Sequence, residues 1–98
     1  MYTHFKDFEK DLRAQGFDEV VEVSWPPLTI VEAHQHAHAA RALVVKGEMW
    51  LTVGTHTRHL TRGFEFQLAA NEPHSERYGA EGATYWVARR TEPWTERS

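Results

Sequence analysis

Residues 34–54 read HQHAHAARALVVKGEMWLTVG, and this stretch decides the expected fold. Apolar and polar residues alternate over 48–53, and Gly54 follows as a turn residue. Successive side chains of a β-strand point to opposite faces, so the alternation predicts a half-buried strand. The segment 41–46 also reads as a strand, and we expect it to end at Gly47. Three histidines stand immediately before these two predicted strands.

Further short strands are predicted on both sides of this stretch. Runs rich in β-branched and aromatic residues place them at 19–24, 28–35, 55–61, 64–68, 74–78 and 83–89, with a turn at 79–82. Many short strands separated by glycine- or proline-marked turns are typical of an all-β sandwich or closed barrel. The predicted core consists of apolar residues on these strands: Val21, Leu28, Ile30, Val31, Leu43, Val45, Leu51, Val53, Phe64, Phe66, Leu68, Tyr85 and Val87.

The N-terminal part of the chain predicts one short helix, over residues 4–15. One face carries apolar residues at helical spacing, namely Phe5, Phe8 and Leu12. Gly16 is a suitable C-terminal cap, because glycine adopts the left-handed conformation at low cost. A chain of 98 residues suits a single domain. We therefore expect a helical segment, 1–17, that packs on a barrel formed by 18–98.

The composition excludes several classes of protein. Net charge is −3, from 11 Lys and Arg against 14 Asp and Glu, so the chain lacks the basic surface that nucleic-acid binding usually needs. There are no cysteines, which excludes disulfides, iron–sulfur clusters and thiol nucleophiles. No stretch approaches the roughly 20 apolar residues of a membrane span, and the N-terminus does not read as a signal peptide. We expect no nucleic-acid or membrane partner and a cytoplasmic location.

Seven histidines are the unusual feature of the composition. His34 and His36 are two apart on a predicted strand, so their side chains share a face with Cα atoms roughly 6.6 Å apart. Two imidazoles at this spacing can bind one ion at about 2.0–2.1 Å per nitrogen. His74, just after a loop, is the expected third ligand. Glu32 lies on the same nominal face as His34, either as a solvated rim charge or as an acid near the ligands.

In these residues the sequence resembles the cupin superfamily. The family's first motif is a His-x-His pair, three or four residues, a Glu, six residues and a Gly. Here His34, His36 and Gly47 stand in register with it. Ala40 occupies the position of the Glu, and Leu28 that of the glycine that usually opens the motif.

The family's second motif is Gly, five residues, Pro-x-Gly, two residues, His, three residues and Asn. Gly63 and His74 match it at the expected spacing. Ala69 replaces the Pro, Asn71 the Gly and Tyr78 the Asn.

The resemblance covers about residues 18–90 and implies a jelly-roll barrel with the ligands inside its wider mouth. It also implies a small single-domain cupin and a homodimer. With Ala40 in place of the carboxylate, three neutral imidazoles leave the ion its full double charge and more open coordination positions. His38 is an alternative fourth ligand, because it lies one strand period beyond His36.

The expected cofactor is a divalent transition metal, with Fe, Ni, Zn, Mn and Cu as candidates. Its open positions could bind and polarise two oxygens of a small molecule. The leading hypothesis is a metal-dependent enzyme, dioxygenase- or isomerase-like, that acts on a small oxygenated molecule. A free His38 could then transfer protons. One alternative is a non-catalytic module that binds or senses a small ligand, and another is a purely structural barrel that carries no metal. The sequence leaves all three open.

Overall fold

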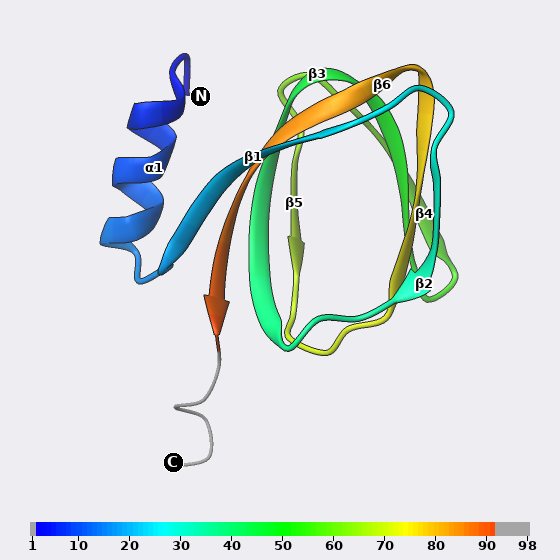
Figure 1. Cartoon of the computed structure of the whole chain (residues 1–98). Coiled ribbons are helices and arrows are strands. Elements are labelled where there is room, and N and C mark those ends of the chain that lie inside the picture. The colour runs from blue at the N-terminus through cyan, green and yellow to red at the C-terminus, as the bar shows by residue number, and fades with distance from the viewer. Residues whose placement is uncertain (1, 92–98) are drawn as a thin grey trace.

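Two long antiparallel strands, β3 (His38–Val53) and β6 (His74–Thr91), organise the computed structural model of this protein, in which residues 2–91 are described. One helix and four shorter strands complete it: α1 (Phe5–Ala14), β1 (Glu19–Trp25), β2 (Ile30–His34), β4 (His56–Thr61) and β5 (Glu65–Leu68). The strands wrap around a common centre, and α1 lies outside them beside β1 (Figure 1). The expected all-β barrel with a short N-terminal helix is confirmed.

All six strands belong to one hydrogen-bonded network, which β3 and β6 divide into two layers. In one layer the order is β1, the second half of β6, the first half of β3, and β5. In the other it is β2, the first half of β6, the second half of β3, and β4. Because both long strands bend from one layer into the other, the inner faces of the layers pack together as a jelly roll.

The long strands bend where their pairing shifts register, on both sides of Gly47. Gly47 has a φ of 76°, and a Cβ at this position would lie 2.1 Å from the carbonyl oxygen of Gly82. The close approach leaves no room for a side chain, and glycine adopts this backbone conformation without the strain that it imposes on most other residues. The predictions that a strand ends at Gly47 and that 79–82 is a turn are therefore wrong. Both are irregularities inside continuous strands, because a bulge bends a strand without ending it.

The bulges also reverse which side chains face inward. Ala42 and Val44 belong to the core between the layers before the bend of β3, and Met49 and Leu51 belong to it afterwards. Leu43, predicted for the same core, lies in a second buried cluster on the outer side. The buried members of the inner core are Ala42, Val44, Met49, Leu51, Leu60, Phe66, Leu68, Tyr78, Ala83, Tyr85 and Val87.

Three predicted core residues are exposed: Leu28, Ile30 and Phe64 leave 72%, 66% and 51% of their surface accessible. Leu28 lies in the turn between β1 and β2, and Phe64 lies before the first residue of β5. Ile30 precedes Val31, which packs against the inner core in its place. The predictions for Leu28 and Phe64 are wrong because both residues lie outside the strands. The prediction for Ile30 is wrong because the apolar pair Ile30 and Val31 does not reveal which of its two residues faces inward.

Two non-glycine residues in the described part of the chain have a left-handed backbone, Leu28 with a φ of 60° and Asn71 with a φ of 64°. Both occupy positions where the cupin motifs have glycine. Asn tolerates this conformation, whereas it costs other residues roughly 1–2 kcal/mol. At both positions the backbone thus has a conformation that glycine adopts at low cost.

The helix α1 packs on the outside of the barrel through Phe8 and Leu12, which are both buried. They share the outer cluster with Leu43 of β3 and Trp86 of β6. The rings of Phe8 and Trp86 lie 5.8 Å apart. Gly16, just after the helix, has a φ of 101°, as expected for a residue that terminates it. In residues 2–91 no helix is long and apolar enough to cross a membrane.

Candidate metal centre

His34 and His74 are direct partners in the pairing of β2 with β6, and their ring centroids are 4.3 Å apart. β2 reaches this register through an irregularity between Val31 and His34. The irregularity adds one residue to β2, so that Val31 and His34 both face inward. Glu32 is exposed, and the predicted common face of Glu32 and His34 is therefore wrong. Its exposure agrees with the other interpretation of Glu32, a solvated charge at the rim of the barrel.

His36 lies in the connection between β2 and β3, not on a strand as predicted. Its backbone carbonyl accepts a hydrogen bond from the Asn71 amide at 2.6 Å, which ties this connection to the loop before β6. Its ring centroid is 4.7 Å from that of His34 and 5.5 Å from that of His74. One ring nitrogen from each of the three histidines lies within 4.8 Å of the others. The fold thus brings together the three residues that the sequence singled out.

Backbone carbonyls orient the rings of His34 and His74. Nδ1 of His34 donates to the carbonyl oxygen of Glu32, and Nδ1 of His74 to that of Glu72, each at 2.9 Å. A carbonyl oxygen can only accept, so Nδ1 carries the proton in both rings. In a neutral ring, Nε2 then bears the free lone pair, which is the form that binds a metal. The two histidines therefore hold their Nε2 lone pairs in fixed orientations, ready to bind an ion.

A buried carboxylate, Glu76, lies against these rings and was not among the predicted site residues. Its Oε2 is 3.3 Å from Nε2 of His74 and 3.8 Å from Nε2 of His34. The Glu76 side chain is only 8% exposed. Glu76 follows His74 by two residues on β6, so the two side chains share a face. This His-x-Glu spacing was the sequence signal that would have identified it.

Tyr78 holds the other oxygen of Glu76. Its hydroxyl donates to Oε1 of Glu76 at 2.5 Å. Burial, followed by the nearby Tyr85 and Glu76, raises the pKa of Tyr78 far above its usual value, so the hydroxyl stays protonated. The ring of Trp25 stacks on that of Tyr78 with centroids 5.5 Å apart, and Trp25 Nε1 donates to the Tyr85 hydroxyl at 3.1 Å. Tyr78 is therefore a well-supported hydrogen-bond donor to the carboxylate.

His38 begins β3 and lies beside the three clustered histidines rather than among them. Its ring stacks on that of His36, with centroids 4.9 Å apart and planes within 7°. Its Nδ1 is buried and has no hydrogen-bond partner in the described part of the chain. A cavity of about 40 Å³ adjoins the site, lined by His36, His38, Ala40, Phe66, Leu68, His74, Glu76, Tyr85, Val87 and Arg89. Such a volume has room for an ion or one or two waters, not for a large ligand.

The surroundings of His36 favour its neutral form. Partial desolvation of the ring is the largest cause that lowers its pKa, although His36 as a whole residue is exposed, and the neighbouring His34, His38 and His74 lower it further. Bringing imidazoles together makes it costly to protonate all of them at once. The neutral form, which a metal requires, is therefore favoured at His36.

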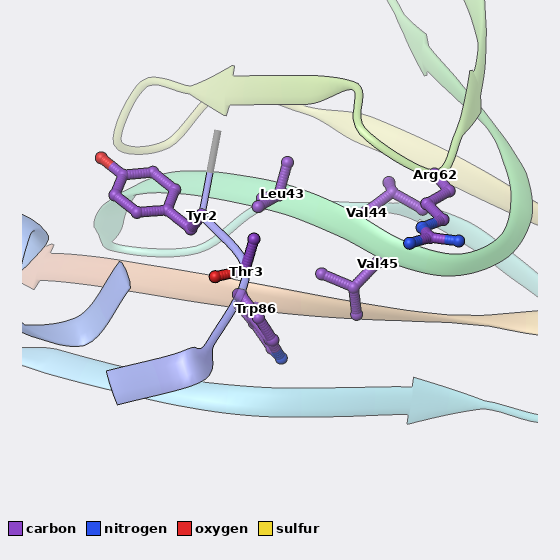
Figure 2. A pocket seen from close by; sticks show the side chains of 7 residues that line it. All are labelled: Tyr2, Thr3, Leu43, Val44, Val45, Arg62 and Trp86. Atoms are coloured by element: carbon purple, nitrogen blue, oxygen red, sulfur yellow. The ribbon is translucent and has the colours of Figure 1, made fainter. Parts of the chain in front are cut away.

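A larger cavity, of about 320 Å³, lies between the N-terminal segment and the helix-facing side of β3 (Figure 2). Its lining residues are Tyr2, Thr3, Leu43, Val44, Val45, Arg62 and Trp86. None of these is a histidine or a carboxylate. The histidine cluster is therefore the stronger candidate for a metal centre.

Comparison with known sequences finds a relative that matches part of the chain. No protein-family model matches the chain. A stretch of 64 residues, 64% of this chain, is 42% identical to H2HPP isomerase of Bacillus subtilis. That stretch covers 27% of the isomerase, so the chain spans about a quarter of the length of this curated relative.

Solved structures share the fold at low sequence identity. The cupin domain of Schizosaccharomyces pombe Cnp3 has a TM-score of 0.72 at 15% identity, covering 83% of this chain and 61% of that one. DMSP lyase DddQ from Ruegeria pomeroyi DSS-3 has a TM-score of 0.69 at 21% identity, covering 76% and 38%. The Cupin_2 domain of an XRE family transcriptional regulator from Enterobacter cloacae has a TM-score of 0.63 at 14% identity, covering 74% and 80%. The same fold thus serves in enzymes and in regulators.

Proposed function

We propose, from the premise that this chain is a cupin by fold, that it binds one divalent transition metal and catalyses isomerisation of a small oxygenated molecule. The proposed ligands are His34, His36 and His74. The observation that carries the proposal is the convergence of their ring nitrogens within 4.8 Å. Nitrogen ligands of one ion lie about 3–4 Å apart when each bond is about 2.0–2.1 Å, so small rotations of these side chains suffice. Fe, Ni, Zn, Mn and Cu remain the candidates.

Isomerisation is the reaction that the curated relative favours, because H2HPP isomerase is named for it. Bound at this site, a divalent ion supplies Lewis acidity that polarises the oxygens of a substrate. Moving a proton within a substrate breaks one bond to hydrogen and forms another, so it needs no oxidant. His38 stacks on His36, one of the three proposed ligands, without belonging to them. We assign it the transfer of this proton.

A second candidate is non-catalytic binding of a small ligand, and the regulator's cupin domain favours it. Such a module would act through a partner protein. Ligand affinity that survives removal of the metal would distinguish it from the enzyme. We also propose a homodimer, which sedimentation analysis would detect as a mass near twice 11.4 kDa.

Elemental analysis of protein purified without an affinity tag tests the metal site. We expect one transition-metal ion per chain, and we expect His34→Ala to abolish it. The matched control is His56→Ala, because His56 is an exposed histidine of β4. Protein that contains no metal and takes up none from added Fe, Ni, Zn, Mn or Cu salts would contradict the proposal.

A substrate panel of enols, diketones and hydroxy acids tests the reaction. Isomerisation changes the ultraviolet absorbance of the substrate without uptake of dioxygen, and it should disappear in the chelated protein. Uptake of dioxygen would instead assign a dioxygenase. Stabilisation of the chelated protein by a panel compound, without turnover, would favour the binding module.

A further inference from the structure

The proposed function leaves one buried group unexplained, the carboxylate of Glu76. In the described part of the chain, no Lys or Arg nitrogen forms an ion pair with it, although Arg89 lines the same small cavity; the groups within 4 Å that could carry a positive charge are the imidazoles of His34 and His74. Its side chain is 8% exposed. A buried carboxylate is costly unless a positive charge and hydrogen bonds compensate it. Tyr78 provides a hydrogen bond to one oxygen, and the source of positive charge at the other oxygen has to be found.

The contact between Glu76 and His74 indicates where the positive charge beside Oε2 of Glu76 comes from. Nδ1 of His74 is committed to the carbonyl oxygen of Glu72, so Nε2 of the neutral ring is an acceptor. It faces a second acceptor, Oε2 of Glu76, at 3.3 Å. Two facing acceptors are stable only when a proton or a cation lies between them. His34 repeats the arrangement, with Nδ1 on a carbonyl and Nε2 3.8 Å from the same Oε2.

We propose that Glu76 is a fourth protein ligand of the metal, bound through Oε2 beside the three histidines. The inference rests on the metal site proposed above. Glu76 and Ala40 line the same small cavity, although they lie on different strands. Glu76 would therefore supply from β6 the carboxylate that the cupin motif places at position 40. Its negative charge lowers the net charge of the site by one, and its oxygen takes one coordination position.

Tyr78 is a positioning residue in this arrangement. It donates to Oε1 of Glu76 and leaves Oε2 directed at the histidines. Partners of this kind keep a ligand in its binding orientation and typically contribute tenfold to hundredfold in metal affinity. The tyrosine stands two residues after Glu76, on the same face of β6, at the position where the second cupin motif has Asn.

Titration of the metal-free protein with Co²⁺ tests the proposal, with calorimetry for affinity and visible absorption for the ligand set. Glu76→Gln keeps the shape of the side chain but removes its charge. We expect it to weaken Co²⁺ binding by about 100-fold and to shift the absorption band. The matched control is Glu32→Gln, which changes an exposed carboxylate of β2 and should alter neither readout. Tyr78→Phe should shift the band with a loss of about tenfold in affinity.

The outcomes separate this inference from the metal site itself. Loss of binding in His74→Ala with unchanged affinity and spectrum in Glu76→Gln would overturn the role of Glu76 and leave the metal site intact. Tighter binding by Glu76→Gln would also overturn it, because it would mean that Glu76 forms an ion pair with protonated histidines. A wild-type protein that binds no Co²⁺ would overturn both. Circular dichroism of each variant verifies that it is folded.

Discussion

His34 and His74 face each other as paired residues of β2 and β6, and each ring donates from Nδ1 to the carbonyl oxygen two residues before it. Two segments far apart in the chain thus orient a histidine ring through the same backbone hydrogen bond. Sheet register places the rings, and the backbone carbonyls determine which nitrogen is free. His36 lies in a connection and is exposed, so it has the most freedom to adjust to an ion.

Chelation should lower the melting temperature of the protein as isolated. A ligand that binds only the folded state stabilises it by about 2.7 kcal/mol when its free concentration is 100 times its dissociation constant. For a domain of this size, each 1 kcal/mol shifts the melting temperature by roughly 4–8 °C. Thermal unfolding with and without EDTA measures the effect. His74→Ala should show no difference between the two conditions, and an EDTA-insensitive wild type would count against the site.

Metal affinity should fall as the pH drops below about 6.5, because each ligand imidazole must lose its proton to bind. The metal-free protein should also lose stability on acidification. The pKa of His36 is lowered in the folded state, chiefly by partial desolvation and then by the neighbouring histidines, so the unfolded chain takes up this proton first. The free energy of unfolding therefore declines as pH falls through about 6.5. Titrations between about pH 8 and 5 measure both effects, and an affinity that stays constant to pH 5 would exclude imidazole ligands.

Leu28→Gly should stabilise the protein. Leu28 has a φ of 60° and exposes 72% of its surface, so the substitution relieves backbone strain and removes few contacts. The expected gain is about 0.5–1 kcal/mol, after allowance for the greater freedom of glycine in the unfolded chain. Leu28→Ala is the control, because it shortens the side chain but keeps the Cβ that causes the strain. Equal stability of the two variants in urea denaturation would refute this explanation.

Gly47→Ala and Gly54→Ala form a matched pair of variants. Their difference in stability measures the effect of the close approach between β3 and β6 at Gly47. Both glycines have positive φ, 76° and 62°. A Cβ on Gly47 would lie 2.1 Å from the carbonyl oxygen of Gly82, whereas nothing lies within 4 Å of one on Gly54. We expect a cost of about 1–2 kcal/mol at Gly54 from conformation alone, and about 3 kcal/mol or more at Gly47. Chemical denaturation of both variants measures the difference in their free energies of unfolding. Equal costs would contradict the prediction, because they would mean that β3 and β6 can move apart at Gly47 without loss of stability.

Leu12→Ala should destabilise the whole protein, not only the helix. Leu12 is fully buried between α1 and the barrel, and truncation of such a residue typically costs about 2–5 kcal/mol. Lys10→Ala, on the exposed face of α1, should cost less than about 0.5 kcal/mol. If 1–17 and the barrel form one domain, circular dichroism and tryptophan fluorescence should report a single coincident transition. Separate transitions would show that the helix is an independent unit.

The sequence alone was sufficient for the fold class and for the three histidines that meet. Alternation over 48–53 and in β5 identified strands, because a half-buried strand requires a period of two. The register of His34, His36 and His74 with a known motif predicted their proximity, and the structure brings their ring nitrogens within 4.8 Å. Their role as metal ligands stays a prediction.

Only the tertiary structure decided which residues face inward and what surrounds the histidines. Bulges beside Gly47 and between Val31 and His34 change the count of residues along a strand, so inside and outside exchange without any change in local composition. Glu76 emerged as a neighbour of His34 for the same reason, since pairing of β2 with β6 sets their distance. Periodicity is a local property of a strand, whereas register depends on the partner strand. The arrangement of the candidate metal centre depends on register, because the pairing of β2 with β6 places His34 opposite His74.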